Sequence, residues 1–396
     1  MRHIVFVDDD PNVLDGLRDA LRPRRDEWRM TFVIGADAAL SVLHREPIDV
    51  VVSDLQMPGM NGTALLAAIA RIQPDAVRIV LSGHTDPKAI GRAVVVAHRI
   101  LAKPSTIADI AAVIERSCVL LDVTGEARLI HAARISELPS APTIYFELMQ
   151  QLGSSDVSAA QLAAVLEHDI AMSAKVLQLA NSAYFARRQP VSSLRDAVTL
   201  LGHNTLRSLV LSAEAYGKFP IVTSIPGFSL EALQNRSLRV GRLAHKLSQG
   251  NPKADDAFAA GLLLDIGLLV LAAHEPAYLT EVLLAAEREG RPMHEIELDC
   301  HGITHAEVGA HLLALWGLPH TIVEAVAHHH RPLRSPIPAL DSVAVTHIAD
   351  ALVADIEACP PDGPISLSHI DLEYLQRIDV TERIAEWQRL AKRLPS

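Results

Sequence analysis

The stretch from Val50 to Gly62 constrains the fold of this chain more than any other. Three valines and a serine lead directly into Asp54, and a Pro-Gly turn follows at residues 58–59. A short β-branched run without polar alternation is typical of a strand that is buried on both faces of a parallel sheet. Open α/β sheets place their chemistry at the carboxyl ends of such strands, so Asp54 is the first candidate functional residue.

The first 121 residues alternate predicted strands with predicted helices. The expected strands are residues 4–7, 30–34, 50–54, 78–81 and 99–102. Helices are expected after the first three of them. Pro11, which suits a first helical turn, opens one, and the others cover residues 36–45 and 63–71. Five β/α units of this length predict a doubly wound, five-stranded parallel sheet.

Polar side chains follow four of these strands. Asp8 and Asp9 follow the first, Asp54 ends the third, Ser82 follows the fourth and Lys103 follows the fifth. Three carboxylates that meet in one pocket repel one another unless a cation joins them, and oxygen ligands suit Mg²⁺. Asp54 is then a plausible nucleophile toward a phosphoryl group, whose oxygens Ser82 and Lys103 would contact.

Residues 1–121 closely resemble the receiver domain of two-component response regulators, a flavodoxin-like fold. The matching segments are Val-Asp8-Asp9-Asp10-Pro, Ser-Asp54-Leu-Gln-Met-Pro-Gly, Leu-Ser82-Gly and Lys103-Pro104. The resemblance implies that Asp54 accepts a phosphoryl group from a histidine kinase or a phosphotransfer protein. It also implies that Asp8, Asp9, Asp54 and the backbone carbonyl of Gln56 hold Mg²⁺, and that Ser82 and Lys103 sense the phosphoryl group. Family members usually carry Tyr or Phe three residues before the lysine, where this chain has Ile100.

Apolar residues at helical spacing predict a last receiver helix over residues 105–121, and residues 122–137 are expected to form a linker that continues it. Gly125 is the one residue in this segment that argues for a break. A long helix here would couple the two halves or pair with a second copy of the chain in a homodimer. An ordinary linker is the alternative, and the sequence does not decide between them.

From residue 138 onward the pattern is helical throughout. Apolar stripes at helical spacing predict helices over residues 143–153, 159–167, 172–181, 194–201, 205–216 and 230–248. Ala257 to Ala273 is apolar nearly all round and is expected to be one central buried helix with Asp265 in its middle. A carboxylate in that setting needs partners or a metal, because its burial without them costs several kcal/mol.

Histidines are frequent in the last third of the chain, and the whole sequence has 19. Histidine and aspartate side chains on facing helices can hold a metal inside a helical bundle. For His328, His329 and His330 we favour a simpler interpretation, in which the three residues end a helix and imidazolium interacts with its dipole.

Residues 137 to about 358 are similar to the HDOD domain, an all-helical relative of the HD metal-dependent phosphohydrolases. The resemblance rests on seven segments: 138–142 (LPSAP), 177–185 (LQLANSAYF), 197–202 (AVTLLG), 260–267 (AGLLLDIG), 305–309 (HAEVG), 315–319 (LWGLP) and 329–332 (HHRP). The active enzymes use a helix-borne His, a His-Asp pair and a later Asp as metal ligands. Here Asp265 remains from the pair, while Leu264 stands in place of its histidine and Arg236 in place of the first one.

The candidate site of the helical half is therefore degenerate. His305, His329, His330 and Asp350 match later ligand positions, and the Gly-Tyr-Pro segment that marks cyclic-dinucleotide phosphodiesterases is absent after His330. Leucine cannot coordinate a metal, and a guanidinium repels cations and pairs with carboxylates. We expect an Arg236–Asp265 ion pair in place of a metal, and no cofactor in this half.

These patterns predict four segments: a receiver domain (1–121), a linker (122–137), an HDOD output domain (138–358) and a helical extension packed on it (359–396). Lys and Arg number 36 against 47 Asp and Glu, a net charge of −11, which argues against direct nucleic-acid binding. Three widely spaced cysteines, no leader and no uninterrupted apolar span indicate a cytoplasmic protein without a membrane segment.

We expect a response regulator whose non-enzymatic output domain contacts a downstream signalling protein. One alternative is an HD-type phosphohydrolase that acts on a nucleotide or cyclic dinucleotide, against which Arg236 and Leu264 argue. Another is a phosphate sink whose helical half is only structural.

Overall fold

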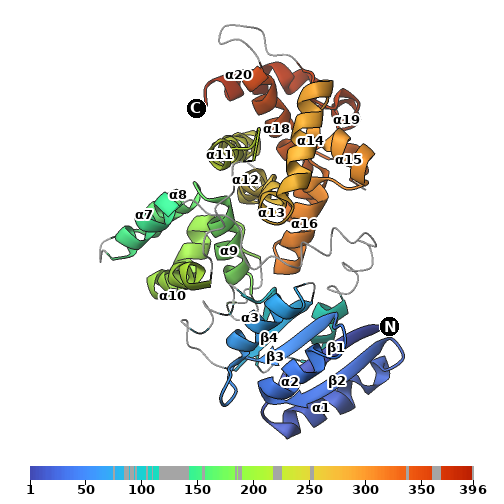
Figure 1. The fold of residues 1–396 in the computed structure, drawn as a ribbon. Helices are drawn as coiled ribbons and strands as arrows, with labels where there is room; N and C mark the ends of the chain where they lie inside the picture. Colours follow the sequence, from blue (N-terminus) through green and yellow to red (C-terminus); the bar gives the residue numbers. More distant parts are fainter. Residues whose placement is uncertain are drawn as a thin grey trace.

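The computed structural model has an α/β half followed by an all-helical half (Figure 1). It describes residues 1–74, 76–83, 89, 93, 96–103, 106–108, 110–115, 142–153, 157–182, 185, 190–216, 225–249, 254–335, 339–358 and 367–394. The predicted linker at 122–137 lies outside these residues.

The α/β half contains one five-stranded parallel sheet in the order β2-β1-β3-β4-β5, which confirms the predicted fold class. Its elements are β1 (Arg2–Asp8), α1 (Pro11–Leu21), η1 (Arg22–Arg24), β2 (Trp28–Ile34), α2 (Gly35–Leu43), β3 (Val50–Asp54), α3 (Gly62–Ile72), β4 (Val77–Ser82) and β5 (Arg99–Ala102). All residues of β3 and β4 are buried, as their largely apolar sequences predict, and this includes Arg78 of β4.

The register of the sheet brings the predicted site residues to one edge. Val7 pairs with Ser53, so Asp8 and Asp54 end neighbouring strands at the same level. Ser82 pairs with Ala102 on β5, and Lys103 is the next residue. Parallel pairing therefore gathers residues that lie up to 95 positions apart in the sequence.

The helical half begins at α7 and continues to the end of the chain. Its elements are α7 (Pro142–Leu152), α8 (Ala159–Leu166), α9 (Ile170–Ala180), α10 (Leu194–Tyr216), α11 (Leu230–Leu247), α12 (Ala254–Leu263), α13 (Ile266–His274), α14 (Pro276–Glu289), α15 (Met293–His301), α16 (His305–Trp316), α17 (His320–His328), η2 (Pro332–Arg334), α18 (Ser342–Ala358), α19 (Leu372–Arg377), η3 (Thr381–Arg383) and α20 (Ile384–Lys392). Gly202 has a φ of 71° inside α10 and kinks it, where the sequence predicts two helices.

The predicted single helix at 257–273 is wrong, because the chain breaks between α12 and α13 at Leu264 and Asp265. Gly267 lies so close to α16 that a Cβ on it would meet the carbonyl oxygen of His305. The turn before Gly267 lets α13 approach α16 and aims Asp265 at its partners. Apolar periodicity does not reveal such a tertiary constraint.

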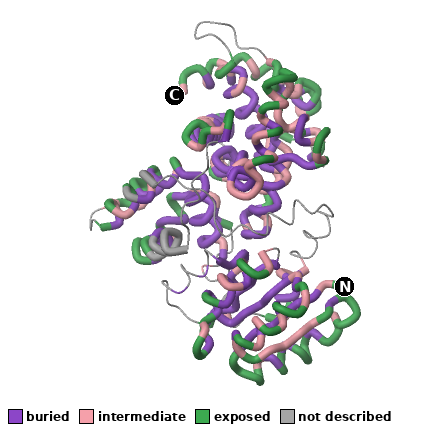
Figure 2. Tube along the Cα trace, viewed as in Figure 1, coloured by how far each residue is buried: buried purple, intermediate pink, exposed green. Residues whose placement is uncertain are grey.

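Segment Ala254–His274, which spans α12 and α13, is long and apolar enough to cross a membrane by composition, and 78% of its most apolar window is buried inside the protein. Leu264 belongs to a core cluster that also includes Val345 of α18 and, from the C-terminal extension, Tyr374 and Trp387. The segment is therefore packed here as the core of the helical half. In Figure 2 the buried residues are concentrated in the interior helices.

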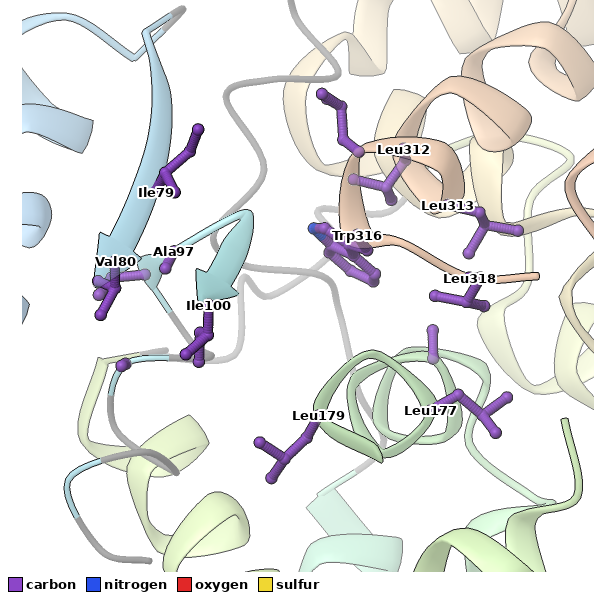
Figure 3. Packing of buried hydrophobic residues seen from close by; sticks show 14 of the residues in the cluster. Ile79, Val80, Ala97, Ile100, Leu177, Leu179, Leu312, Leu313, Trp316 and Leu318 are labelled. Atoms are coloured by element: carbon purple, nitrogen blue, oxygen red, sulfur yellow. The ribbon is translucent and has the colours of Figure 1, made fainter. Parts of the chain in front are cut away.

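The two halves share an interface at which β5, α9 and α16 meet (Figure 3). The Gln178 side-chain amide donates to the carbonyl oxygens of Ala97 and His98 at 3.2 and 3.1 Å. The Arg99 guanidinium donates to the carbonyl oxygen of Ala314 at 3.4 Å. Ile100 is buried in the apolar cluster that spans both halves, so the position that is usually aromatic here packs at this junction.

A buried lysine also lies at this interface. The Lys175 ammonium sits 3.9 Å from the centre of the Trp316 ring, a cation–π contact. Burial, together with the charge of Arg78 on β4, lowers the pKa of Lys175 to about 7. The protonated form is thus disfavoured at the interface.

Lys175 should make stability depend on pH. Above pH 7 the folded chain has lost this proton, whereas the unfolded chain keeps it until about pH 10.4. The free energy of unfolding should therefore rise with pH by up to ~1.4 kcal/mol per unit, relative to Lys175→Met. Urea unfolding at pH 7 and pH 9 measures the difference.

Lys246→Met, at an exposed position of α11, is the matched control and should keep the wild-type pH dependence. An unchanged pH dependence in Lys175→Met would contradict the assignment.

Candidate functional site

The first candidate site, here called the Asp54 site, lies at the carboxyl ends of β1, β3 and β5. The Lys103 ammonium contacts Asp8 Oδ2 at 2.8 Å and also forms an ion pair with Asp54 Oδ1. Both carboxylates are buried, with 3% and 8% of the Asp8 and Asp54 residues exposed. One cation thus joins two buried carboxylates.

Backbone groups orient the two carboxylates. The amide of Gln56 donates to Asp54 Oδ2 at 2.8 Å, and the amide of Asp10 donates to Asp8 Oδ1 at 3.0 Å. Gly62 begins α3 against β3, where a Cβ would lie 2.0 Å from the carbonyl oxygen of Asp54. The Asn61-Gly62 pair therefore combines a helix cap with close approach to the strand end, since the Asn61 side chain caps α3.

The remaining predicted residues of the Asp54 site surround these contacts. Asp9 is exposed beside Asp8, Gln56 is exposed and Ser82 is buried at the end of β4. The Lys103 amide donates to the carbonyl of Ser82 at 2.6 Å, which holds the lysine backbone against that strand end. Burial would lower the pKa of Lys103, but hydrogen bonds to Asp54 and Asp8 raise it, so the ammonium stays charged.

This donor set suits a hard divalent cation. Two buried carboxylates with a third exposed next to them carry more negative charge than one lysine neutralises. All the side-chain donors are oxygens, the ligand type that Mg²⁺ prefers. Residues Asp8, Asp9 and Asp54 and the Gln56 carbonyl are the groups that would hold it.

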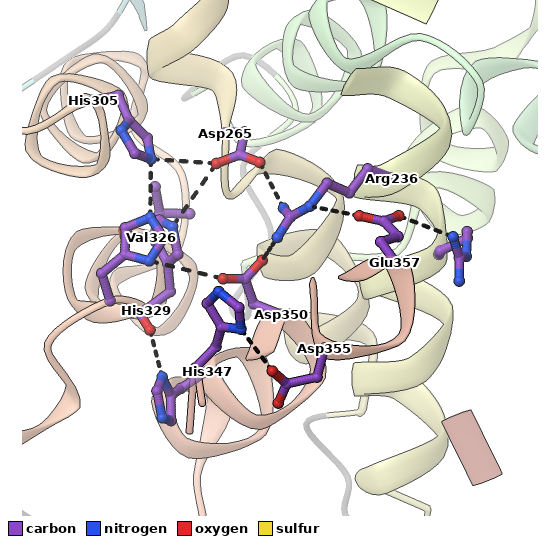
Figure 4. Close-up of polar contacts among 12 residues, drawn as sticks. Arg236, Asp265, His305, Val326, His329, His347, Asp350, Asp355 and Glu357 are labelled. Carbon is purple, nitrogen blue, oxygen red and sulfur yellow. Dashed lines mark hydrogen bonds and ion pairs between the residues drawn. The ribbon is translucent and has the colours of Figure 1, made fainter. Parts of the chain in front are cut away.

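The second candidate site, here called the Asp265 site, lies inside the helical half (Figure 4). Arg236 on α11 pairs with Asp265 Oδ2 at 3.0 Å, with Asp350 Oδ1 on α18 at 2.7 Å and with Glu357 at 3.6 Å. The structure thus contains the expected Arg236–Asp265 pair, and Asp350 is a second partner. These carboxylates raise the pKa of Arg236 despite its burial, so it is a fixed cation.

Histidines occupy the other side of Asp265. His305 Nε2 lies 3.4 Å from Asp265 Oδ1, and His305 Nδ1 lies 2.7 Å from Glu297 Oε2. His330 Nε2 lies 3.1 Å from His305 Nε2, and His329 Nε2 lies 3.9 Å from Asp265 Oδ1. Burial alone would lower the pKa of His305, but the two carboxylates raise it to about 10.

The favoured interpretation of His328–His330 as a charged helix end is wrong. His328 is the last residue of α17, but His329 and His330 turn inward to the Asp265 site. Burial lowers the pKa of all three, and the charge of His305 adds to this effect for His329 and His330. Lowered pKa values favour the neutral imidazole over an imidazolium cap at all three positions.

Leu264 is fully buried in the core cluster next to α11 and α18. Two further residues of the Asp265 site were missed from the sequence. Glu297 of α15 is fully buried against His305, and His294 stacks on His330 with 4.2 Å between ring centres. The available sequence signal for Glu297 was its position between the apolar Ile296 and Leu298, eight residues before His305.

A cavity of about 460 Å³ opens onto this site. Its lining includes Arg236, Asp265, His294, His305 and His330. The charged groups around Asp265 are therefore accessible from the cavity rather than sealed in the core.

Comparison with known proteins identifies both halves. Residues 4–115 match the response regulator receiver domain, and residues 138–332 match the HDOD domain. An uncharacterized protein of Treponema pallidum is 26% identical over 208 residues, which cover 52% of this chain and 40% of that protein. The hydrogenase transcriptional regulatory protein HoxA of Cupriavidus necator is 38% identical over 87 residues, 22% of this chain and 17% of HoxA.

Among solved structures, the MmoQ response regulator from Methylococcus capsulatus is similar over 64% of this chain and 98% of MmoQ, with 23% identity and a TM-score of 0.49. The regions matched in the two curated relatives span two fifths or less of those proteins.

Replacement of Arg236 should destabilise the helical half strongly. Arg236→Met leaves Asp265 and Asp350 without their shared cation, at a cost of about 3–5 kcal/mol. Asp265→Asn combined with Asp350→Asn in the same variant should recover much of this loss. Urea unfolding of the three variants measures both effects.

Arg239→Met is the matched control one turn further along α11. Arg239 pairs only with the half-exposed Glu357 among its described ion pairs, so its loss should cost at most about 1 kcal/mol. Equal effects of Arg236→Met and Arg239→Met would refute the central role of Arg236.

Proposed function

Because this chain is a response regulator that joins a receiver domain to an HDOD domain, we propose that it relays phosphorylation of Asp54 to a non-catalytic helical output. The observation that carries the proposal is the contact of Lys103 with both Asp8 and Asp54 at the end of the sheet. The phosphoryl donor would be a histidine kinase or a phosphotransfer protein. The output would be contact with a downstream signalling protein in the cytoplasm.

The chemistry at Asp54 is transfer of a phosphoryl group to a carboxylate. An oxygen of Asp54 forms a bond to phosphorus while the bond from phosphorus to the donor breaks, which leaves an acyl phosphate. Mg²⁺ would neutralise charge on the phosphoryl oxygens. The Gln56 amide orients Asp54, and Lys103 supplies a positive charge next to the attacked group.

Asp54→Asn should abolish phosphorylation. The amide is a poor nucleophile, so incubation with acetyl phosphate and Mg²⁺ should label the wild type and leave the variant unlabelled. Mass spectrometry of the intact protein detects the added group. Asp37→Asn, at an exposed position of α2, is the control and should be labelled like the wild type.

Coupling to the helical half runs through β5. A phosphoryl group on Asp54 carries about 1.5 to 2 negative charges, which draw the Lys103 ammonium away from Asp8. Lys103 directly follows β5. At the other end of that strand, the carbonyl oxygens of Ala97 and His98, directly before β5, accept hydrogen bonds from Gln178. Movement of β5 would therefore alter the contacts that dock α9 and α16.

This coupling predicts a fluorescence change at Trp316. In a Trp28→Phe, Trp387→Phe background Trp316 is the remaining tryptophan of the three in the chain. Beryllium fluoride with Mg²⁺ should shift its emission, because docking changes around the ring. Lys103→Ala should still bind the mimic and lose the shift.

Lys246→Ala is the control for Lys103→Ala and should keep the shift. A second arm uses Gln178→Leu, which removes both hydrogen bonds to the receiver domain and should change the emission before the mimic is added. A full shift in Lys103→Ala would exclude this route.

The rival function is an HD-type phosphohydrolase acting on a nucleotide or cyclic dinucleotide. Arg236 argues against it, because a guanidinium between Asp265 and Asp350 holds the place that a catalytic metal would need. Turnover of a cyclic dinucleotide by purified protein that is lost in Asp265→Asn would favour the rival.

A further inference from the structure

One carboxylate and three imidazoles converge in the helical half, with ligand atoms that all lie within 4.8 Å of one another. They come from three places: Asp265 precedes α13, His305 begins α16, and His329 and His330 follow α17. We propose that Asp265, His305, His329 and His330 bind a single divalent transition-metal ion that ties these helices together without hydrolytic activity. This goes beyond the proposed signalling function.

Neighbouring groups turn the Nε2 atoms of two imidazoles toward the site. His305 Nδ1 lies 2.7 Å from the Glu297 carboxylate, and His329 Nδ1 lies 2.8 Å from the Val326 carbonyl oxygen. An imidazole that donates through Nδ1 to such acceptors presents Nε2 to a metal. At His305 the ion would displace the Nε2 proton that Asp265 and Glu297 stabilise in the metal-free protein. His330 Nδ1 faces Asp350 Oδ2 at 3.8 Å, so its Nε2 also points inward.

The distances between ligand atoms are close to those of a small tetrahedral site. An ion with bonds of about 2.0–2.1 Å places its ligand atoms about 3.3–3.4 Å apart. The measured separations are 3.4 Å for Asp265 Oδ1 to His305 Nε2, 3.1 Å for His305 Nε2 to His330 Nε2, and 3.9 Å for Asp265 Oδ1 to His329 Nε2. Side-chain movement that brings His329 closer to Asp265 is needed to close the set.

An independent observation also points to a ligand. Among the described residues, the Nε2 of His329 has no hydrogen-bond partner although the side chain is fully buried. Because its Nδ1 donates to Val326, this Nε2 is an acceptor, and it lies 3.9 Å from the Asp265 carboxylate, which is itself an acceptor. A cation between the two would satisfy both.

Chemistry selects the kind of ion and the kind of site. Three nitrogen ligands and one oxygen suit Zn²⁺ and similar ions rather than Mg²⁺. Four protein ligands close a tetrahedral site, which is typical of structural rather than catalytic zinc. Arg236 holds the other oxygen of Asp265 and also Asp350, so its charge keeps a second ion away.

The test uses full-length protein that is stripped with a chelator and titrated with ZnCl₂. We expect one high-affinity Zn²⁺ per chain by calorimetry and a rise in the thermal midpoint. His329→Gln and His330→Gln should each weaken binding at least tenfold, and Glu297→Gln by about 10- to 100-fold through the orientation of His305. Co²⁺ in place of Zn²⁺ should give the visible absorption of a tetrahedral site.

His320→Gln is the matched control, because this exposed histidine begins α17 and lies outside the cluster. It should bind like the wild type, and Asp54→Asn should as well, which separates this proposal from the receiver function. Far-UV circular dichroism checks that each metal-free variant is folded, and the half-buried His330 is the position that best tolerates replacement. Absence of high-affinity binding, or equal binding in wild type, His329→Gln and His330→Gln, would overturn the proposal.

Discussion

A carboxylate that is removed from water must be matched by a cation, and this constraint shapes both halves of the protein. In the receiver domain Lys103 joins Asp8 and Asp54, and in the HDOD domain Arg236 joins Asp265 and Asp350. The two cations differ in kind. The lysine is a flexible point charge, which suits it to the contact with a phosphoryl group that we propose, whereas the guanidinium is planar and holds its two carboxylates in a fixed geometry.

The sequence predicts the five-stranded parallel sheet of the receiver domain because the information for it is local. The buried strands are largely apolar runs. Asp8 and Asp54 end two of them and Lys103 directly follows a third, so parallel pairing alone brings these residues together. The ion pair of Arg236 and Asp265 followed from chemistry, since a buried carboxylate needs a cation. The helix break at Asp265 and the inward turn of His329 could not be predicted from the sequence, because both depend on how α13 and α17 pack on α16.

The interface between the halves was also beyond sequence reasoning. In the sequence, Gln178 is a polar residue within a largely apolar helix, and Ile100 is a departure from the aromatic residue usual in the family. Their roles need the placement of α9 beside the start of β5, which no periodicity encodes. At that interface Lys175 lies against Trp316, and burial lowers its pKa to about 7. Burial of this amine between the two halves therefore costs free energy that an apolar side chain at position 175 would not.

Helix α16 joins the two regions from which these proposals arise. Its first residue, His305, belongs to the Asp265 site, and its last, Trp316, packs at the receiver interface. Twelve helical residues span about 18 Å. Gly267 and Gly309 bring α13 and α16 into backbone contact, so α16 has little room to slide along α13. A displacement of one end of α16 is therefore transmitted to its other end. If an ion at His305 or a phosphoryl group at Asp54 moves this helix, thermodynamic reciprocity requires that each changes the binding free energy of the other by the same amount.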